Sequence, residues 1–457
     1  MSTKLPAISV AEQLAQRIAA QRADRLPSAV QQKCEDLLID VAGLCVTARN
    51  EDYIKAALAG CDDEGSCTAI GHARAFSAAS AAFINGTAAH GEDFDDTFEG
   101  GPVHAGAVIV PAVLAACERH RPDGRMALLG IAAGTEVLCR LSLVVPKAVH
   151  RAGFHPTAIF GAMGAAAGVG VALGLDARQI VDALGIAGSM AGGIIEYLAE
   201  GAWTKRLHAG WAAQSGIRAA LLAKQGFVGP RTVFEGVHGL FHGFAHTTHG
   251  DYDALTGDFG TRWVTDTLAF KPYPCGTMAQ PYIDCARRLA ARGIKPEDIA
   301  EIVCEVADGT VHRLWEPLAD KQRPRNGYAA KFATPYLLAT GFVHGGVGLS
   351  AFTEAAISDA RVLALAAKVK FAVDPDNPYP ANYTGHIKAT MKDGGVVEER
   401  QAYLRGGAQE PLARQDVTDK FMLNAQHGGW SRTQSDATLK LLAGLYQGKM
   451  DLSALRK

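Results

Sequence analysis

The stretch from His90 to Ala107 concentrates acids and histidines in one short segment of the chain. It begins His-Gly-Glu-Asp-Phe-Asp-Asp-Thr-Phe-Glu and leads, past His104, into a long apolar run that is typical of a helix. Carboxylates and imidazoles held together are the groups that proton abstraction and proton delivery require. Asp93, Thr97 and His104 are therefore candidate functional residues. A solvated acidic loop with incidental histidines is the alternative interpretation.

Two further segments place titratable or charged side chains at the start of predicted helices. Gly153-Phe-His155-Pro-Thr157 precedes an apolar helix, where the proline suits the first turn and the free backbone amides favour an anion. His155 could there contact a substrate carboxylate or donate a proton to it. In Thr204-Lys205-Arg206-Leu207-His208, Lys205 and Arg206 are either surface charges or clamps for a carboxylate.

Two lysines and a tyrosine follow in the second half of the chain. Lys271 lies in Phe270-Lys-Pro-Tyr-Pro274, where two prolines stiffen the backbone, and a rigid loop positions functional groups well. The segment Ala330-Lys-Phe-Ala-Thr-Pro-Tyr336 supplies Lys331 and Tyr336. We treat these side chains as candidates because they can bind an anion or deliver a proton.

Two other patterns point to different chemistry. Asp93-Phe-Asp95-Asp-Thr97 fits the Asp-x-Asp-x-Thr pattern of phosphatases in which an aspartate accepts the phosphoryl group of the substrate. In those enzymes the motif must follow a buried strand, whereas a helical pattern precedes it here. Four histidines at near-helical intervals suggest a metal, but no acid is interleaved among them: His238, His242, His246 and His249. We favour neither a phosphatase nor a metal site.

The first part of the chain, up to about residue 265, has a helical pattern almost throughout. Gly174 ends one predicted helix, and Asp176 and Gln179 form a capping box that begins the next. Another helix is expected over about residues 203–225. The uncharged stretch from Ala158 to Leu175 is rich in alanine and glycine, which favours a buried core helix over a membrane span.

The pattern changes after the Lys271 segment. Residues 301–306 and 368–373 alternate in the manner of strands with one buried face. Residues 386–391, the Lys-Asp-Gly-Gly turn and residues 396–404 predict a hairpin.

A chain of 457 residues is too long for one compact core. We expect a mainly α protein with an α+β lid: a large all-helical domain over residues 1–268, completed by about 406–457, and a smaller α+β domain over 269–405. Clefts between domains are preferred places for small ligands.

Composition excludes some partners. A net charge of −2 with no lysine or arginine cluster argues against nucleic acid. The amino terminus lacks a basic region followed by an apolar stretch, which predicts no secretory signal and no membrane partner. Nine scattered cysteines without a Cys-x-x-Cys pair favour reduced thiols in the cytoplasm.

Taken in order, five motifs resemble the MmgE/PrpD family over nearly the whole chain. They are Asp93 to Thr97 with His104, Gly153 to Thr157, Lys205 to His208, Lys271 to Pro274 and Lys331 to Tyr336. The resemblance implies a homodimer with no cofactor and an active site between a helical domain and an α+β lid.

The resemblance also implies which residues act. It assigns catalytic roles to Asp93, His104, His155, Lys205, Lys271 and Tyr336, and substrate-binding roles to Thr97, Arg206 and Gln280. Gln280 stands where the family often has a histidine after Cys275, and a glutamine cannot shuttle a proton at neutral pH. Four acids are left to shape the loop: Glu92, Asp95, Asp96 and Glu99.

The family includes 2-methylcitrate dehydratases, cis-aconitate decarboxylases and iminodisuccinate epimerases, whose reactions develop a carbanion beside a carboxylate. We expect a cofactor-independent hydro-lyase of the 2-methylcitrate dehydratase type that acts on a small di- or tricarboxylate. Asp93 or a histidine would remove the α-proton, and His104 or Tyr336 would protonate the departing hydroxyl. The alternatives are an epimerase of an iminodisuccinate-like dicarboxylate, a cis-aconitate-type decarboxylase and a polycarboxylate-binding protein.

Overall fold

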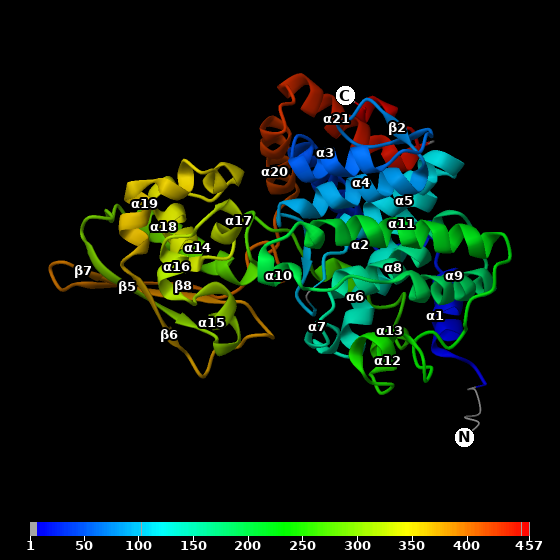
Figure 1. Cartoon of the computed structure of the whole chain (residues 1–457), viewed down its shortest axis with the longest axis horizontal. Helices are drawn as coiled ribbons and strands as arrows, with labels where there is room; N and C mark the ends of the chain where they lie inside the picture. The colour runs from blue at the N-terminus through cyan, green and yellow to red at the C-terminus, as the bar shows by residue number, and fades with distance from the viewer. Residues whose placement is uncertain (1–6, 102, 449, 457) are drawn as a thin grey trace. The chain divides into compact units, whose positions relative to one another are not determined.

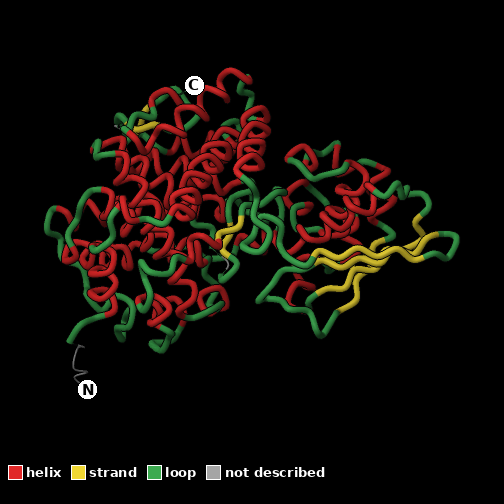
Figure 2. Tube along the Cα trace, turned by 180° about the vertical axis from the view of Figure 1, so that it is seen from behind, coloured by secondary structure: helices red, strands yellow, loops and turns green. Residues whose placement is uncertain are grey.

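A computed structural model describes residues 7–101, 103–448 and 450–456. The predicted absence of a secretory signal rests largely on residues 1–6, which lie outside this description. The chain divides into two compact units, Met1–Leu268 with Ala413–Lys457, and Ala269–Leu412. The first unit is helical, and the longer strands all belong to the second, so the predicted fold class is confirmed (Figures 1 and 2).

The first unit is built almost entirely of helices. Its helices are α1 (Val10–Ala19), α2 (Ser28–Ala48), α3 (Asp52–Gly60), α4 (Ala78–Gly91), α5 (Gly106–His120), α6 (Gly124–Val144), α7 (Ala148–Arg151), α8 (Pro156–Ala172), α9 (Ala177–Met190), α10 (Tyr197–Glu200), α11 (Thr204–Lys224), α12 (Leu240–Ala245), α13 (Tyr252–Thr256), α20 (Arg414–His427) and α21 (Arg432–Gly444). Its strands are the short β1 (Cys67–Thr68), β2 (Ala75–Phe76) and β3 (Thr97–Phe98), which depart from the predicted helical pattern.

Local sequence signals begin and end several of these helices as predicted. The Asp176 side chain accepts a hydrogen bond from the backbone amide of Gln179, and the Gln179 side chain accepts one from the backbone amide of Asp176, so the capping box at the start of α9 is confirmed. Gly174 follows α8 with a φ of +70°, a conformation that glycine adopts without strain. The α11 helix covers the predicted 203–225 segment within a residue at each end.

Two apolar helices lie in the core of this unit. Every residue of α8 is buried, which confirms the prediction of a core helix there. By length and hydropathy α6 could cross a membrane, but 94% of its apolar window is buried inside the protein, as in a core helix. The small residues of these helices allow close contact between backbones: an added Cβ on Gly134 would lie 2.8 Å from the carbonyl oxygen of Gly164.

The α4 and α11 helices pack against each other and cross where both carry a glycine. A Cβ added to Gly86 would lie 2.7 Å from the Cα of Gly210. A Cβ on Gly210 would overlap the carbonyl oxygen of Phe83 and the hydroxyl of Thr87. His90 follows Gly86 by one helical turn on α4, and Lys205 precedes Gly210 on α11, the partner helix at this crossing.

Replacing Gly210 by alanine is expected to destabilise the first unit by about 1–3 kcal/mol, because the new methyl group has no room between the helices. Denaturant unfolding would measure the change. Gly60→Ala is the matched control, since nothing lies within 4 Å of a Cβ at that helical position. Equal stability of the two variants would contradict the tight crossing.

The second unit contains a four-stranded sheet in the order β6-β5-β7-β8. The strands are β5 (Ile299–Val306), β6 (Val369–Val373), β7 (Gly385–Met391) and β8 (Val396–Gln401), preceded at the unit boundary by β4 (Leu268–Ala269). β5 is parallel to β6 and antiparallel to β7, and the predicted hairpin is the antiparallel pair β7–β8. Along β5, Ile302, Cys304 and Val306 are buried, as their alternation predicts.

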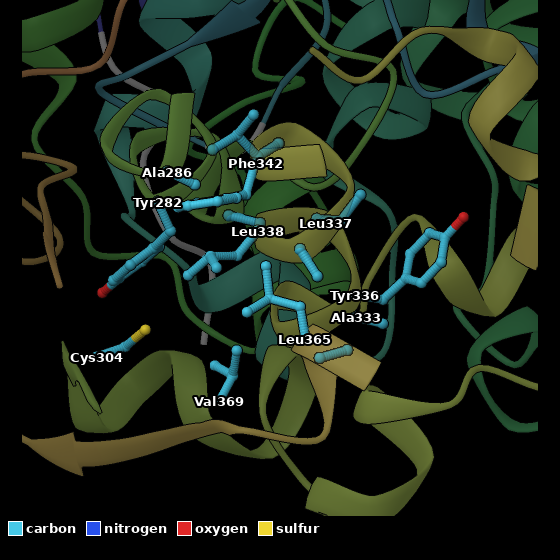
Figure 3. Close-up of a cluster of buried hydrophobic side chains, with 14 of the residues drawn as sticks. Tyr282, Ala286, Cys304, Ala333, Tyr336, Leu337, Leu338, Phe342, Leu365 and Val369 are labelled. Atoms are coloured by element: carbon cyan, nitrogen blue, oxygen red, sulfur yellow. The ribbon is translucent and has the colours of Figure 1, made fainter. Parts of the chain in front are cut away.

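Helices pack on this sheet around one apolar core. They are α14 (Gln280–Ala291), α15 (Asp308–Leu314), α16 (Leu318–Gln322), α17 (Gly327–Ala330), α18 (Thr334–His344) and α19 (Ala360–Ala366). Figure 3 shows part of the core, in which Leu337 and Leu338 of α18 lie with Leu365 of α19 and Val369 of β6. The core therefore joins helices and sheet in one unit.

Candidate functional site

The segment after α4 begins with a buried carboxylate–imidazole pair. His90, in the last turn of α4, has Nδ1 2.6 Å from Oδ2 of Asp95. Both side chains are fully buried. Because a carboxylate can only accept, Nδ1 of His90 carries the shared hydrogen when Asp95 is ionised, and this pairing orients the ring.

A second carboxylate in the segment is paired with a lysine from α11. Asp93 forms an ion pair with Lys205, and the two residues are only 3% and 6% exposed. Asp93 has a φ of +56°, which is uncommon for a residue other than glycine. This backbone conformation persists because the surrounding structure holds it, a situation that is frequent at functional sites.

Asp96 joins this segment to α5. Its carboxyl oxygens accept hydrogen bonds from the backbone amides of Ala105 and Gly106 at 3.0 and 2.8 Å, which satisfies free donors at the helix start. Burial, together with the charge of Asp95, raises the pKa of Asp96 to about 8. The Asp96 carbonyl oxygen lies 2.6 Å from Nδ1 of His104. Because a carbonyl only accepts, His104 carries hydrogen on Nδ1 and directs Nε2 elsewhere.

His155 and His208 bring two more imidazoles to the site. His155 precedes Pro156 at the start of α8, as predicted, and His208 lies in the first turns of α11. Their Nδ1 atoms are 3.1 Å apart, and both side chains are buried.

The four imidazoles form a continuous row. Ring centroids are 5.0 Å apart for His104 and His90, 5.5 Å for His90 and His155, and 5.3 Å for His155 and His208. Burial lowers the pKa of His155 well below its usual value, and nearby histidines lower it further. Burial, with His90 and Lys205 nearby, lowers the pKa of His208 to about 4. His155 and His208 are therefore neutral at neutral pH.

This burial predicts a pH dependence of stability. The pKa of His208 falls from 6.5 to about 4 on folding, so the unfolded chain binds more protons between these values. The free energy of unfolding should be highest above the unfolded pKa and should fall by roughly 3 kcal/mol as pH drops toward 4. Denaturant unfolding at several pH values measures this. His208→Gln should flatten the dependence, whereas the exposed His427→Gln should not; identical slopes would contradict the assignment.

A lysine from the C-terminal segment holds the backbone beside Asp93. Lys420 of α20 donates a hydrogen bond to the carbonyl oxygen of Phe94 at 2.6 Å and pairs with Asp40 of α2 at 2.8 Å. Its ammonium lies 4.0 Å from the centroid of the Phe94 ring. The chain thus returns from the second unit to stabilise the segment that carries the candidate residues.

The predicted substrate-binding residues of the first unit lie in different surroundings. Thr97 is buried in β3. The guanidinium of Arg206 stacks on the ring of Tyr53 at 4.3 Å and lies 4.0 Å from a carboxylate oxygen of Glu92. Tyr53 also donates its hydroxyl hydrogen to Glu92, so Arg206 belongs to a packed polar group beside the ion pair of Lys205.

The remaining predicted residues belong to the second unit. Lys271 is 3% exposed. Gln280 is buried and donates from its amide to the carbonyl oxygen of Tyr273, within the Lys271 segment. The hydroxyl of Tyr336 donates to the carbonyl oxygen of Ala351 at 2.6 Å, and its ring belongs to the apolar core (Figure 3). A joint action of these residues with those of the first unit stays a prediction.

One group in the described chain has the composition of a metal site. Ligand atoms of His90, Asp95 and His104 all lie within 4.8 Å of one another. However, Nδ1 of His90 is 2.6 Å from Asp95 and Nδ1 of His104 is 2.6 Å from the Asp96 carbonyl, which are hydrogen-bond distances. Nitrogens that carry hydrogen act as donors, so these two contacts fit proton chemistry.

Three residues of the candidate site were not predicted as site residues: His90, Asp95 and His208. Asp95 was expected only to shape the loop, but it orients His90. His208 stands three residues after Lys205, on the same face of α11, and that spacing was the available signal.

A helical protein with a smaller α+β unit and a buried cluster of carboxylates, lysine and imidazoles is equipped for proton transfer. The model of the MmgE/PrpD N-terminal domain matches residues 12–252, and that of the MmgE/PrpD C-terminal domain matches residues 273–442. The chain belongs to the MmgE/PrpD family.

Curated relatives carry the names of lyases. The cis-aconitate decarboxylase of Homo sapiens is 32% identical over 360 residues, which cover 76% of this chain and 72% of the relative. That of Mus musculus is 30% identical over 367 residues, covering 76% and 71%. The mitochondrial 2-methylcitrate dehydratase of Yarrowia lipolytica is 27% identical over 214 residues, covering 42% and 38%.

Proposed function

We propose that the protein is a lyase that acts on a small di- or tricarboxylate by proton transfer at a carbon next to a carboxylate. The observation that carries the proposal is the buried Asp93–Lys205 ion pair beside a row of four imidazoles in one unit. The names of the relatives, decarboxylases and a dehydratase, support the same reaction class.

Lys205 supplies the positive charge that the substrate requires. Its ammonium is largely withdrawn from water and is held by Asp93, so little reorganisation is needed when a substrate carboxylate approaches. Electrostatic interactions are stronger in such surroundings than in water. Negative charge that develops beside the carboxylate is stabilised by this preorganised cation.

His104 is suited to carry the proton. Since its Nδ1 donates to the Asp96 carbonyl, Nε2 is the nitrogen that can exchange a proton with the substrate. In a decarboxylation, loss of carbon dioxide leaves an electron pair on carbon, and the imidazolium of His104 donates the Nε2 proton to it. In a dehydration, neutral His104 accepts the α-proton at the same nitrogen and returns it to the departing hydroxyl, so that the carbon–oxygen bond breaks and water leaves.

We place decarboxylation of a cis-aconitate-like tricarboxylate first, because relatives with that name match over three quarters of the chain. Dehydration of a 2-methylcitrate-like substrate is the second candidate. The composition of the site favours dehydration in one respect. Asp93 and the histidines provide more proton-exchanging groups than the protonation of a single carbanion requires.

One assay distinguishes these reactions. The protein is incubated in deuterated water with cis-aconitate, 2-methylcitrate, citrate and iminodisuccinate, each followed by proton NMR. The proposal expects cis-aconitate to lose carbon dioxide, with deuterium entering at the protonated carbon. Water loss from 2-methylcitrate would favour the dehydratase, and inversion of iminodisuccinate would favour an epimerase. Binding without any exchange at carbon would identify a polycarboxylate-binding protein and contradict the proposal.

A further inference from the structure

His155 and His208 are joined by a direct hydrogen bond between imidazole rings. The two Nδ1 atoms are 3.1 Å apart, and the residues come from the start of α8 and the start of α11. They are 5% and 4% exposed, so water does not readily replace either partner.

A bond between two Nδ1 atoms holds one hydrogen. In a neutral imidazole one ring nitrogen carries hydrogen and the other carries a lone pair. The two rings must therefore be in opposite tautomers, one with hydrogen on Nδ1 and the other with hydrogen on Nε2. Since Nδ1 of His155 is occupied by this bond, Nε2 is the nitrogen of His155 that remains for a substrate.

A third segment holds the pair in place. The carbonyl oxygen of Gly193 accepts a hydrogen bond from the backbone amide of His155 at 2.9 Å. A Cβ on Gly193 would lie 3.3 Å from the ring of His208 and 2.6 Å from the Cβ of Ala158. The ring of Tyr197 lies 6.2 Å from that of His155 and 5.8 Å from that of His208.

Nearby histidines and a lysine limit the number of protons that the His155–His208 pair can hold. His90, His104 and His150 disfavour a positive charge on His155. His90 and Lys205 likewise disfavour a positive charge on His208. The ring of Tyr197 packs edge-on against both imidazoles. The two rings together are thus suited to hold one additional proton, not two.

We propose that His208 is a positioning residue that determines which nitrogen of His155 carries hydrogen, and that it takes over the charge when His155 accepts a proton. When Nε2 of His155 accepts a proton, the hydrogen on its Nδ1 moves to Nδ1 of His208, which already carries hydrogen on Nε2. His155 is again neutral, with hydrogen on Nε2 available for return to carbon. This inference rests on the proposed function and on the predicted contact of His155 with the substrate.

Two substitutions test it by kinetics. His208→Leu removes the partner, and His208→Gln keeps a hydrogen-bonding group that cannot hold the proton. Both should lower kcat by about 10- to 100-fold, change KM by less than about threefold, and displace the acidic limb of the pH profile. The control is His427→Leu, an exposed histidine of the same unit, which should behave as the unsubstituted protein does.

A substrate-free measurement separates this inference from the proposed function. Nitrogen-15 NMR of labelled histidines, with His155 assigned by a His155→Gln variant, should show a single tautomer for His155 and a mixture in His208→Leu. An unchanged His155 tautomer together with an unchanged pH profile in a folded His208→Leu protein would overturn the inference. If the tautomer changes but none of the carboxylates is turned over, the pairing stands and the proposed function fails.

Discussion

Replacing Lys205 by methionine is expected to lower turnover by about 10²- to 10³-fold, the typical cost of removing one preorganised charge-stabilising donor. The substitution also leaves the buried Asp93 carboxylate without its cation, which should cost about 3–5 kcal/mol of stability. Steady-state kinetics and denaturant unfolding measure the two effects separately.

The double variant Lys205→Met with Asp93→Asn separates catalysis from folding. Asparagine tolerates the positive φ at position 93 and removes the unpaired charge, so stability should recover while turnover does not. Lys224→Met, at the exposed end of the same helix, is the matched control and should retain full activity. Wild-type kcat/KM in Lys205→Met would refute the role given to this lysine.

Replacing His104 by alanine or glutamine should lower turnover by about 10²- to 10⁴-fold, the range that general acid–base groups contribute. Glutamine can still donate to the Asp96 carbonyl but cannot exchange a proton with substrate, so the fold should be preserved. The measurement is deuterium incorporation into product alongside the melting temperature. His120→Gln, at the exposed end of α5, is the control.

The outcome for His104 also tests the acid–base assignment. If His104→Gln loses turnover but still binds the carboxylate, proton exchange at Nε2 is the step affected. An active His104→Ala protein would show that another group delivers the proton, and the row of imidazoles then points to His155.

Features that depend on short-range patterns were predictable from the chain. The capping box at Asp176, the alternation along β5 and the β7–β8 hairpin each depend on residues that are close in sequence. Their physics is local, since caps and turns satisfy backbone groups within a few residues.

The pairings within the site were not predictable in the same way. The hydrogen bond between His155 and His208 joins residues on different helices, and Lys420 reaches Phe94 from the far end of the chain. Burial likewise depends on tertiary packing: Tyr336 could be named as a candidate, but only the structure shows its hydroxyl bonded to the Ala351 carbonyl. Residue types indicated the chemistry, while partners and tautomers required the fold.

The glycine crossing of α4 and α11 also limits how this protein can be engineered for heat resistance. Glycine-to-alanine substitution in helices is a common means of stabilisation because it restricts the unfolded chain. This substitution is unsuitable at Gly86 and Gly210, because an added carbon would push apart the helix that carries His90 and the helix that carries Lys205. Thermostable variants are better sought at uncrowded positions such as Gly60, where substitution leaves the spacing of these side chains unchanged.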